Sequence, residues 1–85
     1  MSDLQSRFQQ AQQDINDLSH RPDNDTLLQL YALYKQATAG DAGDDQPSAF
    51  DFVKRAKYDA WCGLKGTPVD AAMQRYVELA AKLKK

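Results

Sequence analysis

Hydrophobic residues recur at helical spacing in four segments of the chain, and polar stretches separate these segments. In the first segment, at about residues 3–19, apolar positions lie alternately four and three residues apart and form one stripe of an α-helix. The stripe consists of Leu4, Phe8, Ala11, Ile15 and Leu18. Pro22 disfavours helical geometry in the residue before it, so we expect the helix to end upstream of this proline.

The second segment predicts a helix that contacts neighbours on two sides. It follows three N-cap candidates, Asp23, Asn24 and Asp25, and it stops before Gly40, a residue type common just after a helix. Apolar residues cover more than one of its faces: Leu27, Leu28, Leu30, Tyr31, Leu33, Tyr34 and Ala37. The polar, glycine-containing stretch at 40–47 is then expected to be a loop.

The third segment has a pattern similar to a capping box. Ser48 is the expected N-cap, and Asp51 stands where the box usually has Glu. Gly63 and Gly66 bracket the expected end of this helix. Apolar and aromatic residues recur in this stretch: Phe50, Phe52, Val53, Ala56, Tyr58, Ala60, Trp61 and Leu64.

The fourth segment has the clearest start signal in the chain. Thr67 is the expected cap, Pro68 the first helical residue and Asp70 the residue that returns to the cap. Its apolar residues are Val69, Ala72, Met73, Tyr76, Val77, Ala80 and Leu83. Strand-like alternation occurs nowhere in the sequence. We therefore predict an all-α fold, a small four-helix bundle, in a single domain over residues 1–85.

Composition narrows the classes of function. A chain of 85 residues that is 42% hydrophobic supports one modest core, so a bulky ligand is expected in a surface groove and not in a deep cavity. A net charge of −1 argues against a general nucleic-acid binder. With one cysteine, Cys62, no signal-peptide pattern and no run of 18 apolar residues, we expect a cytoplasmic protein with no stable membrane insertion.

The residue types that usually carry catalysis or bind metals are scarce. His20 lies at the expected C-terminal end of a helix, where its side chain interacts favourably with the helix dipole. Cys62 follows Trp61 on a stretch that is expected to be buried. The acidic loop at 41–45 lacks the alternating ligands and closing Glu of an EF-hand. We therefore predict no metal site, no catalytic residues and no enzyme activity.

Lysine and aromatic residues share one face on each of two expected helices. Tyr31, Tyr34 and Lys35 stand at i, i+3 and i+4 on the second helix. A similar set on the third consists of Lys54, Lys57, Tyr58 and Trp61. Ammonium groups neutralise phosphate and aromatic faces stack on a base, so the sets suit a nucleotide with phosphates on its sugar. Spacing alone leaves open the alternative of core tyrosines beside solvated lysines.

Three sequence runs resemble the signature of the acyl-CoA-binding protein family. Residues 30–41 read Leu-Tyr-Ala-Leu-Tyr-Lys-Gln-Ala-Thr-Ala-Gly-Asp, residues 56–61 read Ala-Lys-Tyr-Asp-Ala-Trp, and residues 64–67 read Leu-Lys-Gly-Thr. The similarity covers essentially the whole chain. It implies an up-down-down-up bundle that binds medium- and long-chain fatty acyl-CoA in a surface bowl. It also implies a monomeric intracellular carrier and pool former that has no cofactor and that serves acyl-CoA-using enzymes.

The resemblance also implies a ligand-binding site. Tyr31, Lys35 and Lys57 would hold the 3′-phosphate region of the ribose. Tyr31 and Tyr34 would flank the adenine and the acyl chain, and Tyr76 would contact the ligand from the opposite side. The apolar path would be lined by Phe8, Ala11, Gln12 and Ile15, with Leu28 as a further contact.

Three positions depart from the family pattern. Asn16 stands where many relatives have Lys or Arg, and Val53 stands where several have Lys, so each removes one phosphate contact. Tyr58 replaces a frequent Trp and keeps an aromatic ring there. Two other functions compete with the carrier: a helical protein-interaction module with an aromatic and basic face, and a thioesterase-like enzyme. The absence of a nucleophile and base constellation argues against the enzyme.

Overall fold

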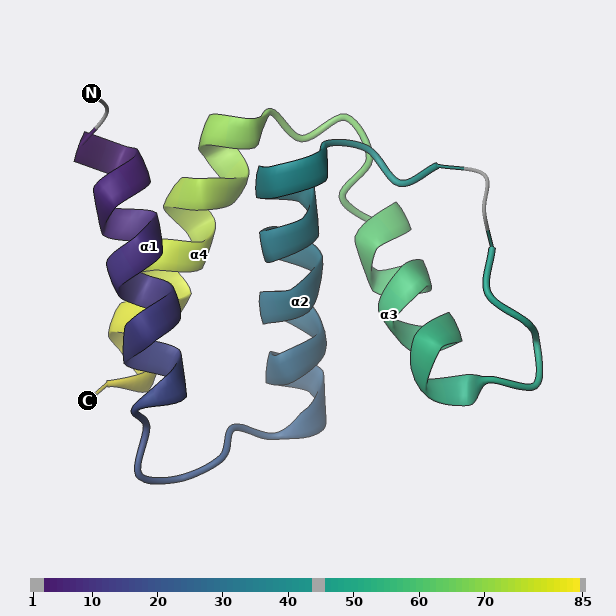
Figure 1. Ribbon diagram of the computed structural model, residues 1–85, viewed down its shortest axis with the longest axis horizontal. Helices are drawn as coiled ribbons and strands as arrows, with labels where there is room; N and C mark the ends of the chain where they lie inside the picture. Colours follow the sequence, from purple (N-terminus) through teal and green to yellow (C-terminus); the bar gives the residue numbers. More distant parts are fainter. Residues whose placement is uncertain (1–2, 44–45, 85) are drawn as a thin grey trace.

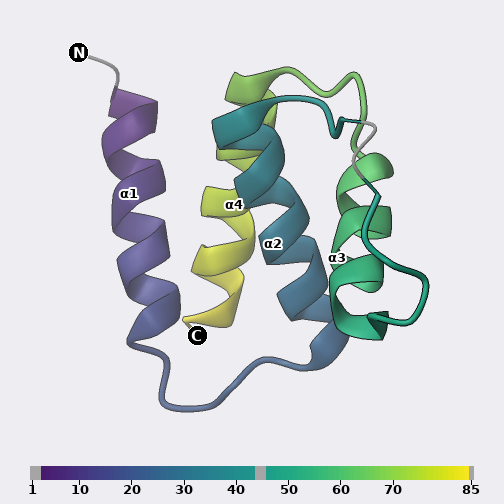
Figure 2. The same cartoon turned by 45° about the vertical axis from the view of Figure 1, so that its right-hand side comes forward.

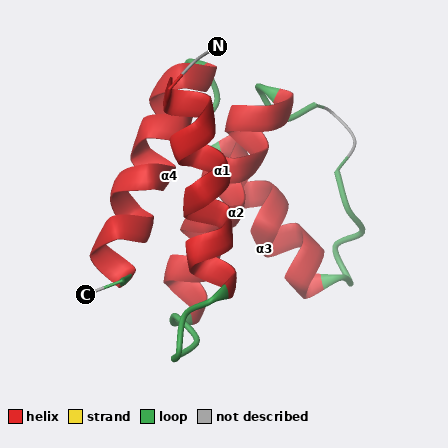
Figure 3. Ribbon diagram, turned by 60° about the vertical axis from the view of Figure 1, so that its left-hand side comes forward, coloured by secondary structure: helices red, strands yellow, loops and turns green. Residues whose placement is uncertain are grey.

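The computed structural model describes residues 3–43 and 46–84, and over these residues it contains four α-helices and no strand. The helices are α1 (Asp3–Asn16), α2 (Asn24–Ala39), α3 (Phe52–Cys62) and α4 (Val69–Leu83). In Figure 1, α1 and α4 run in one direction and α2 and α3 in the other, and loops join them (Figure 3). The predicted all-α, up-down-down-up bundle is therefore confirmed.

The first two helices begin close to where the sequence predicts. α1 ends at Asn16, before the expected Ser19, because the amide of Leu18 bonds the Ile15 carbonyl at 3.3 Å in a tight turn. Asp23 caps α2, and its Oδ1 accepts the Thr26 amide at 2.7 Å. Hydrogen bonding with the Thr26 side chain, followed by that with the Thr26 amide, lowers the pKa of the Asp23 carboxyl. Gly40 follows α2 with a φ of 80°, as expected of the residue after a helix.

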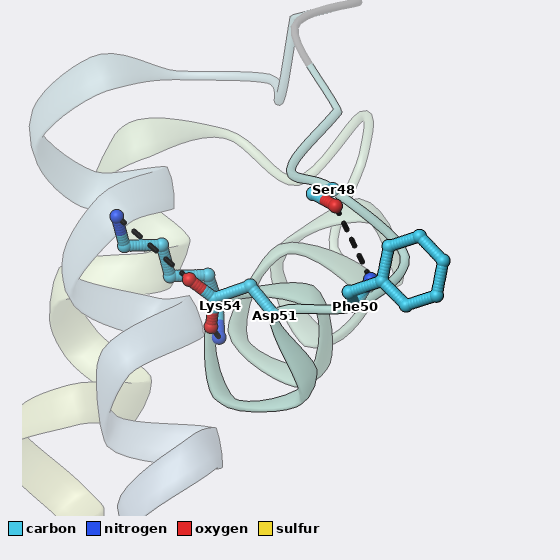
Figure 4. A network of polar contacts seen from close by, with 4 residues as sticks. All are labelled: Ser48, Phe50, Asp51 and Lys54. Carbon is cyan, nitrogen blue, oxygen red and sulfur yellow. Dashed lines mark hydrogen bonds and ion pairs between the residues drawn. The ribbon is translucent and has the colours of Figure 1, made fainter.

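The predicted start of α3 at Ser48 is wrong. The Ser48 hydroxyl accepts the Phe50 amide at 3.2 Å, inside a turn that precedes the helix (Figure 4). Asp51 is the N-cap instead, because its Oδ1 accepts the amide of Lys54 at 3.2 Å. Both residues carry a suitable oxygen, and the one nearer the first helical turn caps it.

The predicted cap of α4 at Thr67 is also wrong. Pro68 occupies the N-cap position, with an extended ψ of 148°, and its carbonyl accepts the amide of Ala72 at 3.0 Å. No side-chain hydrogen bond caps this helix, so Asp70 does not complete a capping box. The backbone of Thr67 serves a tertiary contact instead: its carbonyl accepts the Nε2 group of Gln36 at 2.9 Å.

The hydrophobic core lies between α1, α2 and α4. α4 packs against both α1 and α2, and it lies between them in Figure 2, whereas α3 packs against α2 alone. The Phe8 ring meets Tyr76 edge to face at 5.1 Å between ring centroids and stacks on Tyr34 at 6.2 Å. The buried cluster consists of Phe8, Ala11, Leu30, Leu33, Ala37, Ala72, Tyr76 and Ala80.

The molecule is flat, and one of its helices, α3, contributes no buried residue to the core. Its principal extents are 36 × 31 × 14 Å, so little depth is available for an enclosed cavity. No residue of α3 is buried. On the side of α2 that faces α3, Leu28, Tyr31 and Lys35 are therefore only half-buried, and any bulky ligand site there lies at the surface.

Candidate functional site

A groove of about 610 Å³ lies between α2 and α3. Its lining is mainly apolar and includes Leu28 from α2 and Val53 from α3, and Lys57 provides a cation. The full lining is Arg21, Asn24, Leu27, Leu28, Tyr31, Phe52, Val53, Ala56 and Lys57. An apolar path with a few charged groups is what an amphipathic ligand requires.

A second hollow of about 360 Å³ adjoins this groove, and we call it the lysine hollow. It is lined by Tyr31, Lys35, Pro47, Lys54, Lys57, Tyr58 and Trp61. Tyr31 and Lys57 line both hollows, so the apolar groove and the lysine hollow share a border. The two lysine-and-aromatic sets that the sequence indicates on neighbouring helices therefore line one hollow, with the exception of Tyr34.

The ammonium groups of Lys35 and Lys57, two of the cations in the lysine hollow, lie over aromatic rings. The Nζ atom of Lys35 lies 5.0 Å from the centroid of the Trp61 ring, and that of Lys57 lies 5.3 Å from the Tyr31 ring. Within residues 3–43 and 46–84, neither ammonium forms a salt bridge. Their positive charge therefore remains available to a phosphate group.

A network of hydrogen bonds among Gln36, Asp41, Gly66 and Thr67 lies at the C-terminal end of α2, and we call it the latch. Gln36, 1% exposed, donates through Nε2 to Asp41 Oδ1 at 2.8 Å and to the Thr67 carbonyl. Asp41 Oδ1 also accepts the Gly66 amide at 2.8 Å. The Gly66 amide, followed by the Gln36 side chain, lowers the pKa of the Asp41 carboxyl. The latch thus ties the end of α2 to the α3–α4 link.

Two aromatic residues of α3 are fixed by carbonyl groups of the α2–α3 link. Trp61 donates from Nε1 to the Gly40 carbonyl at 2.8 Å, and this contact orients the ring beneath Lys35. Tyr58 donates from its hydroxyl to the Gly43 carbonyl. Tyr58 therefore lines the lysine hollow while its hydroxyl ties α3 to the loop, which a tryptophan at this position could not do in the same way.

The opposite side of α2 has a separate hollow of about 400 Å³. Here the predicted residues Phe8, Gln12 and Tyr34 come together between α1 and α2. The Gln12 side chain bonds the Phe8 carbonyl at 3.5 Å, and Tyr34 is 39% exposed. The other lining residues are Gln5, Gln9, Ala37, Thr38 and Met73.

Four predicted ligand-binding residues do not line these three hollows. Ala11 and Tyr76 are buried in the core, and Ile15 packs against it. Burial raises the pKa of the Tyr76 hydroxyl, and the nearby Tyr34 raises it further. Asn16 is exposed at the end of α1. Their proposed contacts with a ligand remain predictions.

Sequence reasoning missed several lining residues, of which Arg21 and Phe52 are the most informative. Arg21 lies in the α1–α2 link directly before Pro22, and it lines the apolar groove with Lys57. Phe52 is 78% exposed and stands four residues before Ala56, a spacing that places both on one helical face. The i, i+4 spacing with Ala56 was the signal in the sequence that could have indicated Phe52.

Neither a metal site nor a membrane span emerges from the described residues. These residues contain no group of three His, Cys, Asp or Glu side chains that could hold a metal ion. Among them, no helix combines the length and the apolar character that crossing a membrane requires.

Comparison with known protein families identifies the chain's relatives. Residues 5–80 match the sequence model of the family described as "Acyl CoA binding protein". An acyl-CoA-binding protein of Dictyostelium discoideum is 43% identical over 76 residues, which cover 89% of this chain and 90% of that protein. The acyl-CoA-binding protein of Saccharomyces cerevisiae is 41% identical over 76 residues, covering 89% and 87%.

A larger enzyme also matches, over a small part of its length. Enoyl-CoA delta isomerase 2 of Rattus norvegicus is 43% identical over 83 residues, which are 98% of this chain and 21% of the enzyme. The human protein of that name is 42% identical over 79 residues, or 20% of its length. This chain thus spans about a fifth of those relatives.

Solved structures agree with the sequence matches. The crystal structure of Oryza sativa acyl-CoA-binding protein 2 superposes with a TM-score of 0.89 at 34% identity, covering 94% of this chain and 87% of that one. The crystal structure of the Moniliophthora perniciosa protein gives 0.87 at 34% identity, covering 98% and 80%. These similarities extend over the whole bundle and include the α2–α3 side.

Proposed function

Since this chain belongs to the acyl-CoA-binding protein family, we propose that residues 1–85 form a single domain that binds medium- and long-chain fatty acyl-CoA and carries it without catalysis. One observation carries the proposal. An apolar groove and a lysine hollow share Tyr31 and Lys57, so an amphipathic ligand can occupy both at once. Fatty acyl-CoA combines a hydrocarbon tail with a phosphorylated nucleotide and matches this pair of surfaces.

In this proposal, the lysine hollow receives the 3′-phosphate region of the ligand. Lys35 and Lys57 supply the positive charge and Tyr31 supplies a hydroxyl donor. Tyr31 also offers a face to the adenine, because bases stack on aromatic rings. Leu28 and Val53 offer apolar contacts in the adjoining groove.

The expected free energy of binding is large enough for a carrier of fatty acyl-CoA. Each buried methylene contributes about 0.8 kcal/mol, so a tail with about a dozen buried methylenes gains roughly 10 kcal/mol before ordering costs. The phosphate contacts add selectivity, because a free fatty acid lacks them. Tight binding of the whole thioester keeps its free concentration low, and dissociation delivers it to other proteins.

Phe8, Gln12 and Tyr34 form a second apolar and polar surface across α2 from the lysine hollow. The proposal assigns the path of the acyl chain beyond Tyr34 to this surface, with Ala11, Ile15 and Tyr76 reached when the chain enters between α1 and α2. This assignment accounts for the exposure of Tyr34, whose ring already stacks on Phe8.

The proposal assigns no catalytic residue and no cofactor. Cys62 is half-buried on α3 and lines neither the apolar groove nor the lysine hollow. His20 lines a separate hollow beside the ends of α1 and α4. We expect a cytoplasmic monomer with no stable insertion into membranes, and we expect acyl-CoA-using enzymes to receive its ligand. The isomerase relatives, whose name describes an enzyme of enoyl-CoA, support that last expectation.

Calorimetric titration with palmitoyl-CoA, CoA and palmitate tests the proposal. Palmitoyl-CoA should bind far more tightly than either half of the molecule. Lys35→Met should weaken binding of palmitoyl-CoA roughly tenfold or more, the effect of losing a charge-assisted hydrogen bond. Lys82→Met, an exposed lysine of α4, is the matched control and should leave the affinity unchanged.

Absence of palmitoyl-CoA binding by the wild type would overturn the proposal and favour the protein-interaction module. Equal losses in Lys35→Met and Lys82→Met would contradict the lysine hollow as the phosphate site. Release of free CoA during incubation with palmitoyl-CoA would contradict a carrier and favour a thioesterase.

A further inference from the structure

We propose that Lys54 is a third phosphate-reading lysine of this chain and that it sets the preference for acyl-CoA with an intact 3′-phosphate. The inference rests on the proposed function, and it concerns a residue to which the family resemblance gives no role. Its chemical target is a phosphate monoester, the most highly charged group of the ligand, with a charge of about −1.5 to −2 near neutral pH.

The position of Lys54 carries the inference. Lys54 lines the lysine hollow together with Lys35 and Lys57, so three lysine side chains border one space of about 360 Å³. In Figure 4, the Lys54 side chain extends from the first turn of α3 toward α2, whereas the Phe50 ring points away from the site. The side chain of Lys54 is 75% exposed and free to adjust to a ligand.

The neighbouring residue shows why the cation at this position matters. Val53, the residue before Lys54, lines the apolar groove together with Leu28 and carries no charge. Lys54 shares a helical face with Lys57, Tyr58 and Trp61, which are three, four and seven residues further on, and all four line the lysine hollow. Of the two adjacent residues, Lys54 is therefore the one that brings a cation to the hollow that the other lysines line.

The present partner of Lys54 is easily exchanged for a ligand. Its Nζ lies 3.9 Å from Asp51 Oδ2, at the limit of a salt bridge, and the Asp51 side chain is 44% exposed. Exposed ion pairs of this kind contribute little to stability. Asp51 Oδ1 is already occupied by the backbone amide of Lys54 at 3.2 Å. A phosphate dianion in the hollow attracts the ammonium more strongly than this single carboxylate does.

A binding experiment with two ligands tests the assignment. Palmitoyl-CoA and palmitoyl-3′-dephospho-CoA are titrated into the wild type, Lys54→Met and the control Arg55→Met. Arg55 is adjacent on α3, but it lies 3.4 Å from Asp59, bonds Gln46, and does not line the hollow. Lys54→Met should weaken palmitoyl-CoA binding roughly three- to fivefold, the size of one exposed charge contact, and should change binding of the dephospho ligand less than twofold.

Arg55→Met should bind both ligands as the wild type does, and Lys54→Arg should keep at least half of the wild-type affinity for palmitoyl-CoA. Circular dichroism spectra that match the wild type would establish that each variant is folded. Equal losses for both ligands in Lys54→Met, or no loss for palmitoyl-CoA, would overturn the role of Lys54. Absence of wild-type binding to either ligand would instead contradict the proposed function.

Discussion

The two sides of α2 differ in how they are built. On one side, α2 packs against α4, and its side chains share a buried core with those of α1 and α4. On the other side it meets α3, which buries no residue. Phe52, at the start of α3, is 78% exposed, and Phe50, just before the helix, is 90% exposed. The latch and the half-buried Leu64 and Trp61 anchor this side. The core side therefore provides most of the stability, and the proposed ligand site lies on the side that is less tightly packed.

This difference assigns a physical role to the ligand. A ligand that fills the groove between α2 and α3 acts as the missing apolar layer and stabilises the folded state by mass action. At a free concentration about 100 times its Kd, the expected gain is about 2.7 kcal/mol. The gain should be concentrated in α3, because the other helices are already packed.

The largest expected effect comes from breaking the core side. Leu33→Ala removes a side chain that is 5% exposed, and it should lower the free energy of unfolding by about 2–5 kcal/mol. Val53→Ala, on the open side and 67% exposed, should change it by less than about 0.5 kcal/mol. Urea unfolding of both variants measures the contrast, and similar losses would contradict the division of α2 into two sides.

The latch should give the next largest effect. Gln36→Leu removes the two hydrogen bonds that Nε2 donates, one to Asp41 Oδ1 and one to the Thr67 carbonyl in the α3–α4 link, and their loss should cost roughly 1–3 kcal/mol. The Oε1 atom of Gln36 has no hydrogen-bond partner among the described residues, so removing it offsets part of this cost. Gln29→Leu, at an exposed position of the same helix, is the matched control. Equal unfolding energies for the two variants would sink the proposed role of the latch.

Trp61 on α3 is expected to contribute to stability through its hydrogen bond and to ligand affinity through its ring. Trp61→Phe removes the hydrogen bond to the Gly40 carbonyl and should cost about 1 kcal/mol of stability. The aromatic ring beneath Lys35 remains, so affinity for palmitoyl-CoA should change less than threefold. Trp61→Leu, which also removes the ring, should bind more weakly than Trp61→Phe. Equal affinities of the two variants would show that the ring does not support Lys35.

The smallest expected effect is a loss of folding stability at low pH, which arises from Asp41. Hydrogen bonds from Gly66 and Gln36 lower the pKa of Asp41 in the folded state, so the unfolded state binds a proton more readily. The stability that these bonds confer is complete above the ordinary pKa of about 3.8 and is lost as the pH falls through the lowered value. Asp41→Asn should therefore differ most from the wild type near pH 6 and least near pH 3. A difference in unfolding energy that is independent of pH would contradict this linkage.

The helices and their order could be predicted because periodicity is a local property of the sequence. Two predicted helix starts were wrong because more than one residue near each start could occupy the cap position. Ser48 and Asp51 both have an oxygen for the cap, and the tertiary contact of Thr67 with Gln36 leaves Pro68 at the start of α4. Competition of this kind depends on contacts that are distant in sequence, so local patterns do not resolve it.

The sequence predicted which types of residue line the candidate site, but it did not predict which of the expected residues are buried in the core. Spacing placed Tyr31, Lys35 and Lys57 on facing helices, and they do line one hollow. Spacing could not show that Tyr76 lies in the core, because burial depends on how four helices pack. Arg21 escaped notice since it lies in a link between helices, where periodicity carries no information.

An NMR titration of the full chain with palmitoyl-CoA tests the central claim most directly. The account predicts that the largest amide shift changes fall in residues 21–35 and 47–61, on the two sides of the apolar groove and the lysine hollow, with further changes around Phe8 and Gln12, where the acyl chain is proposed to continue. It also predicts small changes at the outer face of α1 and α4, which is lined by Arg7, Gln10, Val77 and Ala81. Shift changes concentrated on that outer face, or none at saturating palmitoyl-CoA, would contradict the placement of the ligand between α2 and α3.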